Sequence, residues 1–238
     1  MISVCMATYN GERYIKEQLE SVLSNLTEED EIVISDDGST DSTEEMILSY
    51  CEQDKRVHFV KGKGKGVIQN FQNAILHAKG DIIFLCDQDD IWFEDKVDKV
   101  MGCFDNQACS VVVHDAIVVD DTEQVIMKSF QAFRRGGSGI IHNIVRNSYI
   151  GCCMAFRKEL VPYIMPIPNN IEMHDQWIGV LGDMHGGSFF LEEPLLYYRR
   201  HGDNASAIEH YPVGKMISNR IVFCWQLLKR SIRGKVKG

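Results

Sequence analysis

The sequence predicts an α/β fold in which helices cover both faces of a mainly parallel sheet. Two patterns support this prediction. Short apolar runs of strand length alternate with helical apolar stripes through the first half of the chain, and the strand runs are almost continuously apolar. Strands that read this way are typical of a parallel sheet buried on both faces. The alternation therefore favours repeated strand–helix units.

Four strands and three helices are expected in residues 1–104. The strands are expected at 2–6, 32–34, 57–60 and 82–86. The first helix follows Glu12 and has apolar residues three and four apart. The second follows residues of N-cap type at 39–41, and the third begins near Val67 and ends before Gly80.

The second half of the chain is less regular and favours a mixed sheet with more loops. Strands are expected at 111–113, 117–119, 151–156, 189–191 and 195–198. The last two flank a turn at Pro194, and a helix is expected at 175–181. All five prolines lie in this half, where they interrupt regular structure. No linker is long enough to separate two autonomous domains.

Composition excludes several classes of protein. A chain of 238 residues with 45% hydrophobic and 25% charged residues is neither disordered nor fibrous. The net charge of −9 argues against a general nucleic-acid binder, because phosphate contacts need a basic surface. The eight cysteines include no Cys-x-x-Cys pair, which favours reduced thiols in a cytoplasmic protein. The N-terminus lacks a signal-peptide pattern, and no apolar run approaches the length of a membrane span.

Polar side chains gather where three of the expected strands end. They are Thr8, Tyr9 and Asn10 after the first strand, Asp36 and Asp37 after the second, and Asp87, Asp89 and Asp90 after the fourth. Parallel strands bring their carboxyl ends to one edge of the sheet, where ligands bind. Carboxylates gathered at one edge repel one another unless a cation lies among them. We therefore expect a divalent cation, Mn²⁺ or Mg²⁺, together with a phosphate-bearing ligand.

Other interpretations of these residues stay open. Asp36 and Asp37 precede a Gly-Ser-Thr sequence, so turn formation and helix capping are an alternative role. The glycine fingerprint of dinucleotide-binding folds does not follow the first strand, and the chain has no P-loop motif. In the lysine–glycine loop at 61–66, Lys65 either reaches a donor phosphate or lies in a solvated turn. Asn70 either caps the next helix or lines the site.

The chain resembles the inverting glycosyltransferases of family 2, which have a GT-A type fold. Five segments carry the resemblance, in the order expected for the family: VCMATYNGERY (4–14), IVISDDGSTD (32–41), GDIIFLCDQDDIW (80–92), GCCMAFRKEL (151–160) and HDQW (174–177). The third and fifth segments, with YYRRHGDN (197–204), are similar to rhamnosyltransferase-like enzymes of bacterial polysaccharide and O-antigen assembly. The resemblance implies a Rossmann-like mixed central sheet with helices on both faces.

The resemblance also implies roles for individual residues. Asp175 occupies the position of the catalytic base. Donor binding is expected for Thr8, Tyr9, Asn10, Glu12, Asp36, Asp37, Lys65, Asn70, Asp87, Asp89 and Asp90. Metal binding is expected for Asp87, Asp89 and His201, and acceptor binding for Gly151, Cys152, His174 and Trp177. Trp177 either offers its indole to an acceptor sugar or is a core aromatic residue. Ala7 stands where several family members have a hydroxyl for the base, so the nucleobase stays open.

These residue types suit the transfer of a sugar from a nucleoside-diphosphate donor, linked to UDP or dTDP, to a glycan or lipid-linked glycan. A carboxylate that takes the proton of the acceptor hydroxyl accelerates such a step about 10²–10⁴-fold. One base and no protein nucleophile imply a single displacement with inversion. Two other functions stay open: a metal-dependent phosphohydrolase or nucleotidyltransferase, and a noncatalytic nucleotide-sugar-binding protein.

The chain is expected to have three functional parts. Residues 1–104 form a donor-binding half, and residues 105–213 form an acceptor-binding and catalytic-base half of the same domain. Residues 214–238 form an amphipathic tail with seven basic residues and no acidic one. The tail either lies on the anionic inner face of the cell membrane, packs on the body, or joins two copies in a homodimer.

Overall fold

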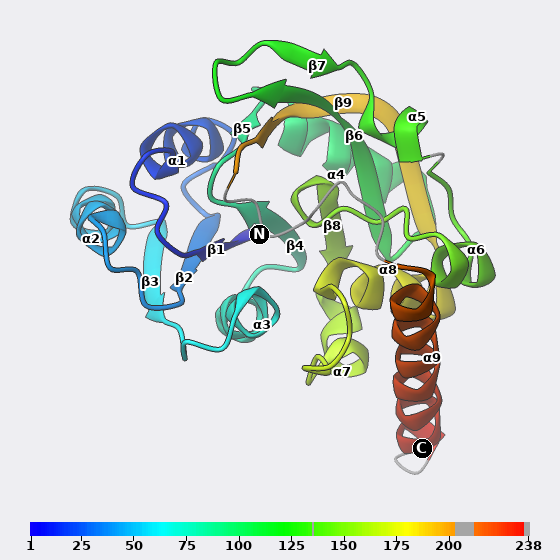
Figure 1. The fold of residues 1–238 in the computed structure, drawn as a ribbon. Coiled ribbons are helices and arrows are strands. Elements are labelled where there is room, and N and C mark those ends of the chain that lie inside the picture. The colour runs from blue at the N-terminus through cyan, green and yellow to red at the C-terminus, as the bar shows by residue number, and fades with distance from the viewer. Residues whose placement is uncertain (135, 203–211, 236–238) are drawn as a thin grey trace.

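A computed structural model describes residues 1–134, 136–202 and 212–235 (Figure 1). The strands within these residues form one nine-stranded sheet in the order β3-β2-β1-β4-β8-β6-β9-β5, and β7 pairs with β6. The strands are β1 Ile2–Thr8, β2 Glu31–Asp36, β3 Val57–Lys61, β4 Ile82–Asp87, β5 Ile91–Trp92, β6 Val111–Asp120, β7 Val125–Met127, β8 Met154–Arg157 and β9 Ser188–Arg200. The sheet is mixed, as the sequence predicts.

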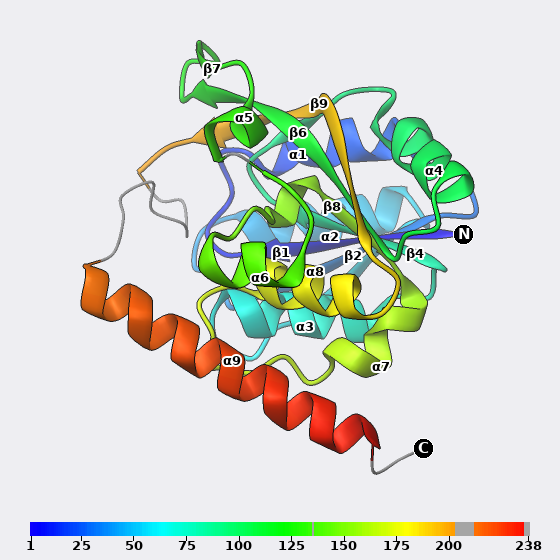
Figure 2. The same ribbon diagram turned by 90° about the vertical axis from the view of Figure 1, so that its right-hand side faces the viewer.

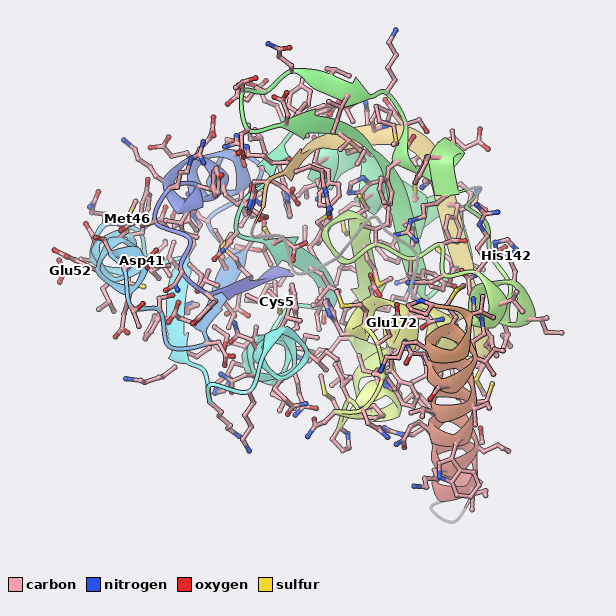
Figure 3. The ribbon with its side chains drawn as sticks, viewed as in Figure 1. Cys5, Asp41, Met46, Glu52, His142 and Glu172 are labelled. Atoms are coloured by element: carbon pink, nitrogen blue, oxygen red, sulfur yellow. The ribbon has the colours of Figure 1, made fainter. Side chains whose placement is uncertain are left out.

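The first four strands are parallel, and their register aligns their carboxyl ends. Thr8 at the end of β1 is paired with Asp36 at the end of β2, and Ala7 is paired with Asp87 at the end of β4. Every residue of β1 and β2 is buried, which explains their continuous apolar character. Cys5 lies in the middle of β1, inside the core (Figure 3). The parallel half of the sheet therefore brings the predicted polar residues to one edge.

Helices cover both faces of this sheet (Figure 2). They are α1 Ile15–Leu23, α2 Thr43–Gln53, α3 Val67–His77, α4 Lys96–Asn106, α5 Phe130–Arg134, α6 Ile140–Val145, α7 Val161–Ile164, α8 His174–Met184 and α9 Val213–Lys235, with short 3₁₀ turns at Gly151–Cys153 and Lys158–Leu160. In Figure 2, α1 and α4 lie above the sheet, whereas α3, α7 and α8 lie below it. The long helix α9 lies outside α8, with Phe223 edge-on to Trp177 at a ring distance of 5.9 Å.

Five predicted strands differ from the structure in the second half of the chain. The strands expected at 111–113 and 117–119 are one strand, β6, whose register against β9 shifts at Asp115. The strands expected at 189–191 and 195–198 are likewise one strand, β9. Pro194 lies inside β9 beside this irregularity, where a strand tolerates a residue without an N–H. The segment expected to be a strand at 151–156 begins with a 3₁₀ turn, and β8 starts only at Met154.

Several elements were not predicted from the sequence. They are the helices α4 to α7 and the short strands β5 and β7. β5 and β7 have two and three residues, too few to establish a periodic pattern. α4 does have an apolar face, which buries Val97, Val100 and Phe104.

The structure also describes the cysteines and the lengths of the helices. All eight cysteines lie in the described part of the chain and are free. Among the described helices, none combines the length and the apolar character needed to span a bilayer. The end of the basic tail, residues 236–238, lies outside the described residues, as do Arg135 and the Asp203-Asn204 pair of the last motif.

The core position of Trp177 leads to a stability prediction. Trp177 is 0% exposed, whereas Trp225 on α9 is 57% exposed. Trp177→Ala should lower the free energy of unfolding by about 3–5 kcal/mol, because it leaves a large cavity between α8 and α9. Trp225→Ala should change it by less than about 0.5 kcal/mol. Urea unfolding followed by circular dichroism measures both values, and equal losses for the two variants would contradict the packing described here.

Candidate active site

The carboxyl ends of β1 and β2 are tied together by Asp36. Its carboxylate accepts hydrogen bonds from the Thr8 hydroxyl at 2.8 Å and from the backbone N–H groups of Gly38 and Ser39 at 3.0 and 2.8 Å. Asp36 is therefore the turn residue that the alternative interpretation describes, and its oxygens are already used. Its predicted contact with a donor stays a prediction, whereas its structural role is evident.

Two further predicted donor residues also support the edge of the sheet. The Asn10 side-chain oxygen accepts a hydrogen bond from the backbone N–H of Thr40 at 2.8 Å. The Glu12 carboxylate accepts one from the backbone N–H of Ser42 at 2.9 Å. Both bonds join the loop after β1 to the loop after β2, so the two loops form one unit.

Asp37 organises the lysine–glycine loop that follows β3. Its carboxylate accepts backbone hydrogen bonds from Gly64, Lys65 and Gly66 at 2.9, 3.3 and 2.6 Å. Gly64 and Gly66 have φ values of +63° and +86°, a region that favours glycine. A side chain at Gly62 would lie 2.5 Å from the carbonyl oxygen of Asp36, so this position also requires glycine. The repeated glycines thus allow the loop to fold over Asp37, which leaves the Lys65 side chain exposed.

Tyr9 and Asn70 lie at the same edge. Gln88 fixes the backbone of Tyr9 from both sides, since its amide accepts from the Tyr9 N–H at 2.9 Å and donates to the Tyr9 carbonyl at 3.0 Å. Tyr9 is 58% exposed, so its side chain is accessible to a flat ligand such as a base. Asn70 is buried and donates to the Thr8 carbonyl at 3.0 Å. Gln88 was not predicted as a site residue, although it lies inside the acidic motif.

The acidic residues after β4 are largely buried. Burial, together with the charges of Asp89 and Asp175, raises the pKa of Asp87 to about 7. The pKa of Asp90 is raised by burial and by its two acidic neighbours. Because Asp87 is influenced by Asp175, the structure brings the end of β4 and the start of α8 into one site, as the sequence predicts.

Two groups of donor atoms in this acidic cluster suit a divalent cation. His201 Nε2 lies 2.7 Å from an oxygen of Asp89, and its ring stacks on Tyr14 with centroids 4.8 Å apart. Asp87, Asp90 and Cys152 offer ligand atoms that all lie within 4.8 Å of one another. Carboxylate and imidazole donors fit Mn²⁺ or Mg²⁺. The sequence assigned Asp87, Asp89 and His201 to the metal, and the structure adds Asp90 and Cys152 beside Asp87.

A buried lysine lies behind the acidic cluster. Lys96 is 0% exposed, donates from Nζ to the Cys152 carbonyl at 2.9 Å, and lies 3.7 Å above the Trp92 ring. Burial lowers the pKa of Lys96. Its charge in turn lowers the pKa of Asp87, so it offsets part of the repulsion among the carboxylates. Sequence reasoning missed Lys96, although a lysine at the start of a helix with an apolar face was a usable signal.

Asp175 lies in the first turn of α8 and is almost completely buried. Burial raises its pKa to about 6, and a backbone hydrogen bond from Gln176, the charge of Arg134 and a side-chain hydrogen bond from Asn147 act in the opposite direction. A carboxylate with a raised pKa close to neutrality is well suited to accept a proton. Arg134 and Asn147 come from segments without a recognisable motif, so the sequence did not reveal them.

Of the predicted acceptor residues, Gly151 and His174 lie beside Asp175, whereas Trp177 lies in the core. Gly151 lies so close to His174 that a side chain on it would lie 3.1 Å from His174 Nε2. His174 stacks on Phe71 at 4.1 Å, and burial lowers its pKa to about 3, so the imidazole is neutral at pH 7. Trp177 is fully buried and donates from its indole N–H to the Ile164 carbonyl at 2.9 Å. A sugar therefore has no open face of Trp177 to stack on, and the core interpretation of this residue is confirmed.

Known proteins share the sequence pattern of this chain. The family model described as glycosyl transferase family 2 matches residues 3–164. The chain belongs to glycosyltransferase family 2. Among its relatives, the dTDP-rhamnosyl transferase RfbG of Shigella flexneri is 30% identical over 215 residues, which cover 84% of this chain and 72% of that protein. An uncharacterized glycosyltransferase of Nostoc is 29% identical over 85% of this chain and 66% of its own length.

Solved structures support the fold of this family 2 glycosyltransferase. The structure of S. aureus TarS in complex with UDP-GlcNAc superposes with a TM-score of 0.74 at 17% identity, covering 93% of this chain and 65% of that one. A mannosyltransferase of Pyrobaculum calidifontis in complex with GDP-Man and Mn²⁺ superposes with a TM-score of 0.64 at 18% identity, covering 98% of this chain and 64% of that one. The predicted GT-A type fold is confirmed. The glycosyltransferase spans about two thirds of the length of most of these proteins.

The raised pKa of Asp175 leads to a prediction about stability. In the folded chain the Asp175 carboxyl stays protonated up to about pH 6. In the unfolded chain the same carboxyl, with a pKa near 3.9, loses its proton at lower pH. Protonation therefore stabilises the fold below about pH 4, and this contribution is lost as the pH rises through 6. As the pH rises from 4 to 8, the free energy of unfolding of Asp175→Asn should increase by about 2–3 kcal/mol relative to that of the unmodified enzyme. Urea unfolding at both pH values measures the gain, and a pH-independent difference would contradict it.

Proposed function

We propose that this glycosyltransferase moves a sugar from a nucleoside-diphosphate sugar to a hydroxyl of a glycan or lipid-linked glycan, with inversion and with a divalent metal. The observation that carries the proposal is the shared site of Asp175 and the acidic residues after β4. The charge of Asp175 raises the pKa of Asp87, although the two residues lie 88 positions apart in the sequence. A base beside a diphosphate-binding group is the arrangement that sugar transfer needs.

The donor is assigned to the parallel half of the sheet, residues 1–104. The open ring of Tyr9 provides a face for the base, and the loop tied to Asp37 brings exposed lysines near the same edge. Asp87, Asp89 and His201 would hold Mn²⁺ or Mg²⁺, which supplies Lewis-acid stabilisation of the departing diphosphate. One relative is a dTDP-rhamnosyl transferase, and one structural neighbour, TarS, is bound to UDP-GlcNAc. A UDP- or dTDP-linked hexose, such as rhamnose, fits this range.

The acceptor is assigned to residues 105–213, around Gly151, Cys152 and His174. Asp175 would accept the proton of the acceptor hydroxyl as the new C–O bond forms at the anomeric carbon and the bond to the diphosphate breaks. The neutral imidazole of His174 adds no charge next to this carboxylate, and the lack of a side chain at Gly151 lets the 3₁₀ turn pack closely against His174. The resulting linkage has the opposite anomeric configuration to the donor. Cell-surface polysaccharide assembly is the process that this reaction would serve.

The role of Asp175 gives the direct test. Asp175→Asn should lower kcat by at least about 10²-fold, because the amide cannot accept the proton, while binding of UDP- or dTDP-sugars persists. In the unmodified enzyme, kcat should rise as the pH increases through about 6, the pKa of this carboxyl. A panel of sugar nucleotides with Mn²⁺, monitored by thermal shift, identifies the donor for the assay. Normal turnover by the variant would refute the assignment, and release of sugar or phosphate without any transfer product would indicate a hydrolase.

The metal assignment is tested at Asp89. Asp89→Ala removes a carboxylate that pairs with His201, so both Mn²⁺ and the nucleotide sugar should bind at least tenfold more weakly in calorimetry. Asp54→Ala is the matched control, since it also removes an ion-paired carboxylate, that of Asp54 with Arg56, but just before the start of β3, at the opposite end of the parallel strands. It should lower stability slightly without changing metal affinity. Unchanged Mn²⁺ binding by Asp89→Ala would place the metal elsewhere.

A further inference from the structure

The helix α9 has two apolar faces, and only one of them is used by the body. On the inner face, Phe223 and Leu227 are buried, and Phe223 packs against Trp177 of α8. Polar contacts reinforce this packing: Asn219 donates to Glu172 at 2.9 Å and Gln226 donates to Asn170 at 2.7 Å (Figure 3 labels Glu172 beside α9). The docking of α9 therefore does not depend on its other face.

The outer face of α9 is a continuous exposed apolar stripe. It consists of residues three or four positions apart that all point away from the body: Val213, Ile217, Ile221, Trp225, Leu228 and Ile232. Ile221 is 65% exposed, so this stripe is open to solvent over most of the helix. A row of six large apolar side chains on one face is not explained by the fold of this chain.

Two residues of α6 extend this outer face. Arg220 of α9 donates to the carbonyl oxygen of Val145 at 3.1 Å, which places the end of α6 beside α9. Ile141 and Val145 are one helical turn apart, and Ile141 is 80% exposed. Figure 2 shows α6 next to the first half of α9, on the same side of the molecule. The exposed apolar surface therefore has a second element beside the long helix.

The charges around the outer face are of one sign. No acidic residue occurs in α9, and the helical rotation places Lys215 and Lys229 on one side of the stripe and Arg220 on the other. Lys229 Nζ lies 5.2 Å from the centroid of the Trp225 ring, so a cation sits directly beside the tryptophan of the stripe. Two copies meeting through this face would bring like charges together, whereas an anionic lipid surface would neutralise them.

We propose that the outer face of α9, with Ile141 and Val145 of α6, lies on an anionic lipid bilayer. Apolar side chains with a tryptophan at the centre and cations along the margins are the pattern of a helix that lies in the membrane interface. The inner face of α9 packs on α8, whose first turn carries Asp175, so the bound bilayer lies on the side of the acceptor residues. This last point rests on the proposed function and favours a lipid-linked acceptor.

Vesicle binding by the full chain tests this surface. The protein should co-sediment with vesicles of phosphatidylcholine and phosphatidylglycerol in equal amounts, and at least tenfold less with phosphatidylcholine alone. Trp92 and Trp177 are buried, so a blue shift of tryptophan emission on binding would report Trp225. Ile221→Ser combined with Trp225→Ser should weaken binding at least tenfold, as should Lys215→Glu combined with Lys229→Glu.

A matched control uses exposed apolar residues on other surfaces. Leu48→Ser on α2 combined with Ile126→Ser on β7 removes two exposed apolar side chains and should leave vesicle binding unchanged. Equal binding by unmodified protein and both α9 variants would overturn the proposal. So would an absence of vesicle binding together with a dimer that the Ile221→Ser/Trp225→Ser variant dissociates, which would assign the face to a second copy.

A separate measurement keeps this proposal distinct from the proposed function. Calorimetry with UDP- and dTDP-sugars is performed on the same proteins without vesicles, and the α9 variants should bind the donor as the unmodified chain does. Vesicle binding without any donor binding would support the surface and remove the proposed function. Donor binding without vesicle binding would remove the surface and leave the proposed function standing.

Discussion

The burial of several carboxylates at one place is the constraint around which this site is built. Asp87, Asp90 and Asp175 all have raised pKa values, chiefly because burial disfavours their charged forms. Such a cluster destabilises the folded chain unless positive charge compensates it. Lys96 supplies part of that charge from inside the core, and the donor atoms of Asp89 and His201 suit a cation at the opposite side of the cluster. The protein thus retains a local instability that a metal and a diphosphate ligand would relieve.

The parallel half of the sheet makes this cluster achievable. Its strands are buried on both sides, so their register is fixed by packing and their carboxyl ends align. The loops beyond these ends are then tied to one another rather than left free. Asp36 and Asp37 are clear examples, because one carboxylate closes the turn after β2 and the other holds the loop after β3. Donor recognition would therefore use a preorganised edge, which reduces the entropy lost on binding.

The elements that follow the parallel strands, β8, α8 and β9, provide the residues that face the acidic cluster from the other half of the chain. β8 and its preceding 3₁₀ turn place Gly151 and Cys152 next to the end of β4, and α8 brings Asp175 to the same point. The long strand β9 then carries His201 back to Asp89 from the far end of the sheet. Each addition reaches the acidic cluster from a different part of the sequence. The site consequently depends on the whole sheet, and α9 lies against the helix that carries the base.

The sequence by itself determined the fold class, the strand-end residues and the family, because burial on both faces and short motifs leave local patterns. It also located the acidic motif and Asp175, since each lies inside a recognisable segment. Only the tertiary structure decided that Trp177 is a core residue, that Asp36 ties β2 to β1 through Thr8, and that Lys96, Arg134 and Asn147 face the carboxylates. These facts depend on contacts between distant segments, and such contacts leave no periodic signal along the chain. For the same reason, the sequence of the tail shows an apolar stripe but not which side of the helix contacts the body. In the structure a different face of α9 packs on α8 through Phe223, and the stripe stays exposed.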